Sequence, residues 1–135
     1  MVLRSAAQHL VSMEKVNLAQ KLSLISDYYN PRIAGEINDS YLKLVKLKGE
    51  FVWHHHDVED ELFLVLKGTL RMMIKDDRGE REVRIGEGEF IIMPHGVEHK
   101  PIADEEVHLL LLEPKTTLNT GNVKNERTVE KLQKV

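Results

Sequence analysis

The stretch FVWHHHDVEDELF, residues 51–63, places three adjacent histidines on a segment with the composition of a β-strand. Because alternate side chains of a strand share a face, we predict that His54 and His56 point one way and His55 the other. Four carboxylates follow, and the last of them, Glu61, opens the next apolar run after a short turn. The stretch therefore predicts two imidazoles and one carboxylate on the same side of neighbouring strands.

A fourth donor, His99, comes from a distant part of the chain. It follows Pro94-His95-Gly96, a turn that ends one strand and returns the chain toward the same site. Cysteine is absent, so thiolate ligands are excluded. Three imidazoles and one carboxylate suit a divalent transition metal ion such as iron, manganese, nickel, zinc, cobalt or copper. We predict that His54, His56, Glu61 and His99 hold one such ion.

The rest of the chain reads as short strands separated by turn residues, and this spacing predicts an all-β sandwich or barrel. The expected strands are 41–47, 51–56, 61–66, 69–75, 81–85, 89–93 and 106–112. Before them, Asn17 and Gln20 form a helix-capping pattern, and apolar residues recur at helical spacing up to Asn30-Pro31. We therefore expect one amphipathic helix over residues 17–30.

The 135 residues are the length of one domain. The net charge is -3, no Lys/Arg-rich run is present, and no apolar stretch approaches the roughly 20 residues of a membrane span. We expect a cytoplasmic protein that binds neither nucleic acid nor membranes. The predicted parts are an N-terminal extension (1–16), the helix (17–30), a β-barrel (37–114) and a polar C-terminal tail on the surface (115–135).

Two motifs in this pattern resemble those of the cupin superfamily. Residues 54–68, HHHDVEDELFLVLKG, resemble the first motif, and residues 88–99, GEFIIMPHGVEH, resemble the second. The short link between the motifs is similar to that of small single-domain bacterial cupins. The resemblance implies a cupin-type jelly-roll β-barrel with the metal near one end, commonly in a dimer, so we expect a homodimer.

Two positions depart from the cupin pattern. Gly49 lies one residue closer to His54 than the first motif places it, and Ala103 stands where the second motif usually has Asn. Neither is a ligand position. The expected consequences are a shorter turn and one lost hydrogen bond around the ligands.

An apolar pocket is expected beside the metal, because residues of the same parity as the ligands face inward with them. The predicted lining residues are Val52, Phe63, Val65, Leu70, Met72 and Ile74, with Phe90 or Ile92 completing the walls. Such a pocket excludes bulk water and strengthens the field of the ion.

The remaining polar residues near the motifs receive weaker assignments. Glu98 is the nearest candidate for a group that moves a proton, although it also fits a solvated turn residue. We expect His9 on the surface and His95 in a turn at the barrel mouth. His108 is expected to be either an exterior packing residue or an interior neighbour of the ligands.

Three functions fit these features. The first is a metal-dependent dioxygenase, because four protein ligands leave two positions of an octahedral ion for an enediol, a 2-oxo acid, a catechol-like molecule or dioxygen. The second is a sugar or phosphosugar isomerase, for which Lys43 is the only cation to consider. The third is a non-enzymatic module that binds a small molecule or a metal.

Overall fold

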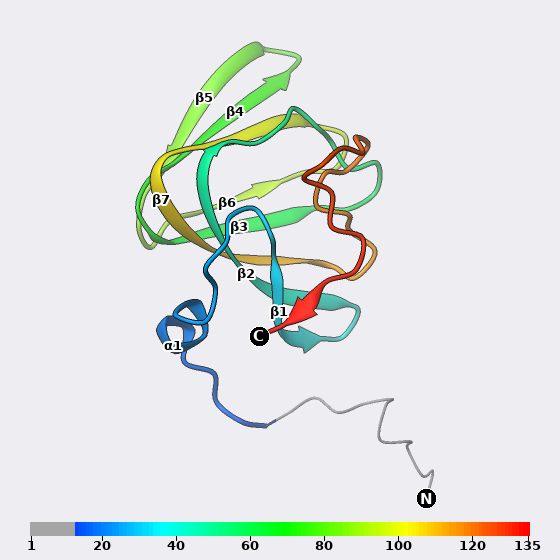
Figure 1. Ribbon diagram of the computed structural model, residues 1–135. Helices are drawn as coiled ribbons and strands as arrows, with labels where there is room; N and C mark the ends of the chain where they lie inside the picture. Colours follow the sequence, from blue (N-terminus) through cyan, green and yellow to red (C-terminus); the bar gives the residue numbers. More distant parts are fainter. Residues whose placement is uncertain (1–12) are drawn as a thin grey trace, which may run out of the picture.

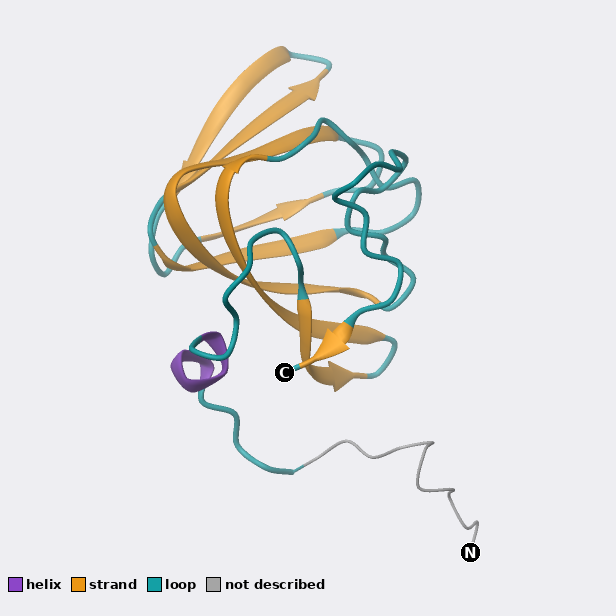
Figure 2. Ribbon diagram, viewed as in Figure 1, coloured by secondary structure: helices purple, strands orange, loops and turns teal. Residues whose placement is uncertain are grey.

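The computed structural model describes residues 13–135 and shows an all-β fold, as predicted (Figures 1 and 2). The elements are α1 (Leu18–Leu22), β1 (Arg32–Ile37), β2 (Ser40–Glu50), β3 (Glu61–Lys67), β4 (Leu70–Asp76), β5 (Gly79–Ile85), β6 (Phe90–Met93), β7 (Glu98–Pro114) and β8 (Gln133–Lys134). The expectation for His9 lies outside the described residues. Within them, no helix is both long and apolar enough to cross a membrane.

The long strand β7 holds the sheet together. Its first part pairs with β4 over 98–102, its last part pairs with β3 over 108–112, and β2 runs antiparallel beside it. β3 also pairs with β6, on the side of β3 away from β7. Figure 1 shows β7 bending around the molecule between these partners. This path brings the start of β7 and the start of β3 to one interior space.

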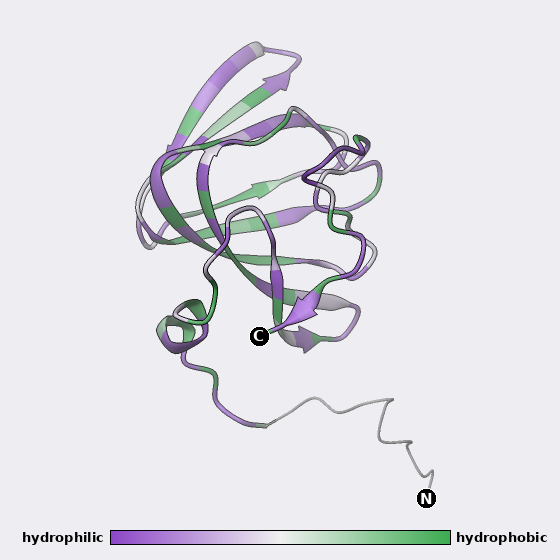
Figure 3. Cartoon of the chain, viewed as in Figure 1, coloured by the Kyte–Doolittle hydropathy of each residue, from purple (hydrophilic) through white to green (hydrophobic). Residues whose placement is uncertain are grey.

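The interior is filled by alternate residues of the strands, as a pleated sheet with one buried face requires. On β4, Leu70, Met72 and Ile74 are buried, and on β3 the same holds for Phe63 and Val65. The outer hairpin strand β5, which Figure 3 shows as mostly hydrophilic, is exposed over most of its length. Together with buried residues of β2 and β7, these side chains form the core of the barrel.

The helix is shorter than the sequence predicted. Asn17 caps α1 as expected, because its side chain accepts a hydrogen bond from the backbone of Gln20 at 2.9 Å, but the helix ends at Leu22 and does not reach residue 30. The helical spacing was misleading because the apolar residues that share it pack in two different places. Leu22 and Ile25 are buried in a small outer cluster, whereas Tyr29 packs in the barrel core with a positive φ of 57°.

The sequence analysis placed residues 115–135, hereafter the C-terminal segment, on the surface, and the structure shows part of this segment packed against the barrel. Thr117 and Thr120 are buried, and the segment ends as β8, which pairs in parallel with β1. Figure 1 shows the segment, coloured orange to red, lying beside one end of the barrel. Strand β1 begins at Arg32, so the sheet also starts earlier than residue 37. The polar composition did not reveal this packing, because the segment satisfies its polar groups by internal hydrogen bonds.

Two glycines with positive φ give a matched test of packing at the turns. A Cβ at Gly68 would lie 2.7 Å from the carbonyl oxygen of Glu106, whereas nothing lies within 4 Å of a Cβ at Gly79. We predict that Gly79→Ala destabilises the fold by about 1–2 kcal/mol through its backbone alone. Gly68→Ala costs at least about 1 kcal/mol more, because the backbone must also shift. Urea unfolding of both variants measures the difference, and equal losses would contradict the steric argument.

Candidate functional site

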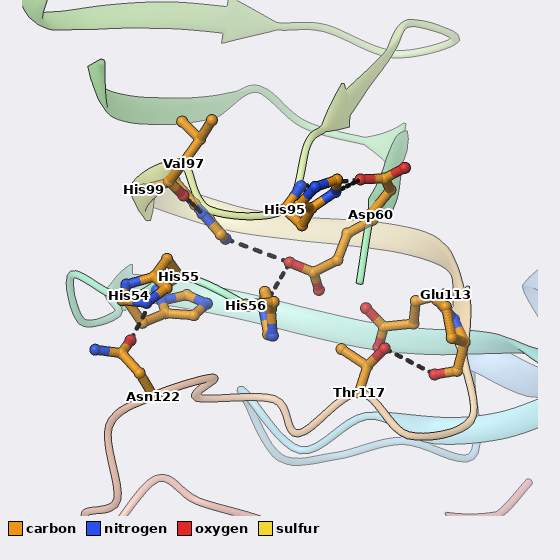
Figure 4. A network of polar contacts seen from close by, with 12 residues as sticks. His54, His55, His56, Asp60, His95, Val97, His99, Glu113, Thr117 and Asn122 are labelled. Carbon is orange, nitrogen blue, oxygen red and sulfur yellow. Dashed lines mark hydrogen bonds and ion pairs between the residues drawn. The ribbon is translucent and has the colours of Figure 1, made fainter. Parts of the chain in front are cut away.

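The structure brings together the four side chains predicted as metal ligands. His54, His56, Glu61 and His99 are each at most 4% exposed, and one donor atom from each lies within 4.8 Å of the others. The Nε2 atoms of His56 and His99 lie 2.7 and 3.3 Å from the same carboxylate oxygen of Glu61. Figure 4 shows the three imidazoles gathered in one place, with dashed lines from His56 and His99 marking these contacts.

The ligand-bearing segment 51–56 is not a sheet strand, although its backbone is locally paired. His54 forms an isolated bridge with His99, through backbone hydrogen bonds of 3.0 and 2.9 Å in the two directions. The predicted strand is therefore wrong, but the predicted alternation of faces holds. His54 and His56 are buried, whereas the side chain of His55 between them is 29% exposed.

Two of the imidazoles are oriented in the same way by their own backbone. The Nδ1 atom of His54 lies 2.9 Å from the carbonyl oxygen of Val52, and that of His99 lies 2.9 Å from the carbonyl oxygen of Val97. A carbonyl oxygen only accepts hydrogen bonds, so each Nδ1 carries the proton. The Nε2 atoms are left unprotonated, with their lone pairs available to a cation.

The centre of the cluster contains polar atoms without hydrogen-bond partners. Nε2 of His56, Nε2 of His99 and Oε1 of Glu61 are buried, and although they lie close together, their geometry satisfies no hydrogen bond. Buried polar atoms without partners are costly, and three of them converging on one point are unusual. A divalent cation fits this arrangement, because imidazole nitrogen and carboxylate oxygen are both suitable donors.

The pKa values of His54 and Glu61 are shifted by burial and by contacts within the cluster. Desolvation, helped by the neighbouring His99, lowers the pKa of His54 to about 4, so this imidazole is neutral near pH 7. Burial alone raises the pKa of Glu61, but contacts with Glu113 and the imidazoles outweigh it and hold that pKa well below its usual range. Neutral imidazoles and an ionised carboxylate are the protonation states that bind metals.

Behind Glu61 lies a buried ion pair that the sequence analysis did not assign. Nζ of Lys43 lies 2.6 Å from Oε1 of Glu113, and both side chains are at most 2% exposed. Burial and the adjacent charge of Glu61 raise the pKa of Glu113 well above its usual range, against the opposing effect of Lys43. Glu113 has the same parity on β7 as the buried residues Leu109 and Leu111, and this signal was available in the sequence.

A cavity of about 40 Å³ lies beside the cluster, which is space for about three waters. Its polar wall residues are Tyr29, His54, Glu61, Glu113 and Asn119, and the remaining walls are apolar.

The predicted pocket residues occupy different places around this cavity. Phe63 lines it, whereas Val65, Leu70, Met72 and Ile74 are buried in the core without reaching it. Val52 does not line it either, and Phe51 lies there instead.

The assignments of Phe90 and Ile92 were wrong. They are 60% and 54% exposed on the outer face of β6. The pairing of β6 with β3 explains this result, because residues opposite each other on antiparallel strands share a face. Met93 lies opposite Glu61 and Ile91 opposite Phe63, so these two residues face inward.

Glu98 does not reach the cavity, which corrects its assignment as a proton carrier. It precedes His99 on β7 and therefore faces the other way. Its carboxylate lies 2.9 Å from Nδ1 of His55 on the outer side. His95 lies in an exposed turn, as predicted, and its side chain contacts Asp60. His108 is an exterior residue whose Nε2 lies 2.6 Å from the carboxylate of Glu106.

Comparisons with known proteins agree with this architecture. Residues 43–113 match the family model described as the Cupin domain. A cupin-2 domain containing protein from Shewanella frigidimarina NCIMB 400 shares 42% identity, over 74% of this chain and 94% of that chain, with a TM-score of 0.70. The uncharacterized protein YdbB of Bacillus subtilis (strain 168) is 35% identical over 65 residues, which are 48% of this chain and 55% of YdbB. The chain thus spans about half the length of this curated relative.

A more distant structure shares the fold alone. Hydroquinone 1,2-dioxygenase from Sphingomonas sp. TTNP3, solved with 4-hydroxybenzoate bound, has 14% identity and a TM-score of 0.62, over 75% of this chain and 74% of that chain. The family match covers more than half of the chain, and it includes all four residues of the buried cluster. The protein is a cupin, with the jelly-roll barrel of that family.

Proposed function

We propose that this cupin binds one divalent transition metal ion through His54, His56, Glu61 and His99, and that it acts as a dioxygenase on a small organic molecule. The observation that carries the proposal is the set of buried donor atoms that converge without hydrogen-bond partners. An ion held by such donors supplies Lewis acidity and electron transfer. Dioxygenation places both atoms of O₂ in the product, so the substrate supplies the electrons and no external reductant is needed.

The residues of the chain contribute binding and exclusion of water. His54 and His99 present Nε2 because their Nδ1 atoms are bound to carbonyl oxygens. The apolar walls, including Phe63, keep bulk water away from the donors. The hydroquinone dioxygenase is too distant in sequence to support more than the fold. The assignment of chemistry therefore depends on the donor set and the adjacent cavity.

The electrostatics of the cavity favour an uncharged, hydroxyl-bearing ligand over an anion. Neither Lys nor Arg is found among its lining residues in the described chain. The buried cation Lys43 already pairs with Glu113, and the cavity wall contains two glutamates. A phosphosugar requires a cation directed at its phosphate, so the phosphosugar form of the isomerase alternative is disfavoured. An enediol or a catechol-like molecule has no phosphate and therefore needs no such cation.

Metal content tests the ligand set. We expect tag-free wild type, measured by elemental analysis, to carry close to one transition metal ion per chain, and His56→Ala to carry at least tenfold less because it removes a buried donor. His55→Ala is the matched control, since this imidazole is turned outward, and it keeps its metal. Equal metal in wild type and His56→Ala contradicts the assignment.

Oxygen uptake separates the enzyme from a binding module. We expect iron- or manganese-loaded protein to consume O₂ with catechols or enediols in the assay, and to consume much less with phosphosugars. Phosphosugars are expected to bind poorly because no Lys or Arg among the described residues lines the cavity to pair with the phosphate. Metal binding without O₂ uptake for any redox metal across such a panel contradicts the dioxygenase proposal.

We also propose a homodimer. With α1 only five residues long, the support comes from β6, where Phe90 and Ile92 expose large apolar side chains next to Leu62 and Leu64 of β3. Exposed apolar patches on a sheet face are typical of interfaces between proteins.

Light scattering at micromolar concentration tests this assembly. We expect twice the mass of one chain for wild type, and one chain for Phe90→Glu, which places a charge in the patch. Val58→Glu, at a 76% exposed loop position, is the control and stays dimeric. A monomeric wild type contradicts the proposal.

A further inference from the structure

The C-terminal segment is bound directly to the stretch that carries two of the four proposed ligands. The backbone N–H of His55 donates to Oδ1 of Asn122 at 2.9 Å, and the backbone N–H of Asn122 donates to the carbonyl oxygen of His55 at 3.0 Å. One residue thus satisfies both backbone groups of His55. Figure 4 shows Asn122 next to His54 and His55.

This pairing replaces the neighbouring strand that residues 51–56 lack. On one side, the backbone of His54 bridges to His99 of β7. On the other side, where a sheet strand would pair with the next strand, Asn122 pairs with His55. The stretch between His54 and His56 is therefore held from both sides, once by the barrel and once by the C-terminal segment.

Gly121 adds a packing constraint to the hydrogen bonds. A Cβ at this position would lie 2.1 Å from the carbonyl oxygen of His55 and 3.1 Å from Cδ2 of the His54 ring. Only glycine allows the backbone to approach this closely, and its φ of 55° also favours glycine. The segment thus contacts a ligand imidazole as well as the backbone between two ligands.

Hydrogen bonds within the C-terminal segment hold its residues together, so that the segment can act as a support. The side chain of Asn119 bonds to the backbone of both Arg127 and Val129, at 2.8 and 2.9 Å. The hydroxyl of Thr120, which is fully buried, lies 2.7 Å from that of Thr128. The guanidinium of Arg127 lies 4.6 Å from the centre of the Tyr29 ring, which anchors the segment to the barrel.

We infer that Asn122 is a positioning residue for the metal site: through the backbone of His55, it fixes the separation of the imidazoles of His54 and His56. The inference depends on the proposed metal binding. A metal site requires its ligands to be held within about 0.5 Å of the productive geometry. Because the Cupin domain match ends at residue 113, this support comes from chain outside the matched region.

The test compares three variants of the full chain. Asn122→Ala removes the acceptor for His55, Asn122→Asp keeps an oxygen in its place, and Asn125→Ala is the matched control. Asn125 makes the same kind of bond, from the backbone of Arg127 to its Oδ1 at 2.8 Å, away from the ligands. Affinity for Co²⁺ is measured by competition with a chromophoric chelator, and the visible spectrum of the Co²⁺ protein reports the ligand geometry.

We expect Asn122→Ala to bind Co²⁺ about 10–100-fold more weakly and with an altered spectrum. Asn122→Asp and Asn125→Ala stay within about threefold of wild type with unchanged spectra. An Asn122→Ala affinity within threefold of wild type overturns the inference. Equal losses in Asn122→Ala and Asn125→Ala also overturn it, because they indicate general destabilisation of the segment.

A metal-free measurement separates this inference from the proposed function. Amide hydrogen exchange at His55 is expected to be slow in wild type and at least tenfold faster in Asn122→Ala. Fast exchange in wild type overturns the support by Asn122. Slow exchange in a wild type that binds no metal shows instead that the proposed function fails while the contact exists.

Discussion

The backbone bridge between His54 and His99 is the interaction on which the site depends. It joins a segment outside the sheet to the first residues of β7, and it brings imidazoles from two distant parts of the chain to one carboxylate. The ring orientations follow from the same local geometry, because each ring bonds to the carbonyl two residues before it. Without the bridge, the segment that carries His54 and His56 would not be held in place relative to His99.

The interior of this barrel contains more ionisable side chains than stability alone explains. Lys43, Glu61 and Glu113 are buried, although an apolar set of similar volume would be as stable or more stable. Such groups in a protein interior are typical of functional sites. The two glutamates line the cavity, whereas Lys43, which pairs with Glu113, does not. The interior therefore presents carboxyl groups to a ligand and keeps the ammonium group of Lys43 away from the cavity.

Sequence reasoning predicted the parts of the site that depend on local periodicity. The alternation of His54, His55 and His56 held even without a sheet strand, because an extended backbone alternates its side chains in either case. It failed for Phe90 and Ile92, since the facing of β6 depends on its register with β3, which the short turn before it does not reveal.

The other differences come from tertiary contacts. A run of apolar residues at helical spacing predicted a long helix, yet Tyr29 leaves that spacing to pack on Phe51 in the core, with ring centres 4.8 Å apart. The packing of the polar C-terminal segment against the barrel was not predicted, because hydrogen bonds between its own side chains and backbone cannot be recognised from composition. Propensity and pattern are local, whereas these placements are decided by distant partners.

The pairing of β8 with β1 has a consequence for how the molecule forms. It joins Arg32 to Gln133, a closure of about 100 residues, and contacts between such distant residues form slowly because the chain must lose more entropy to make them. During synthesis, the barrel strands up to β7 leave the ribosome before Asn122 does. A nascent chain can therefore build the barrel first, while the completed histidine site has to wait for translation of the following residues.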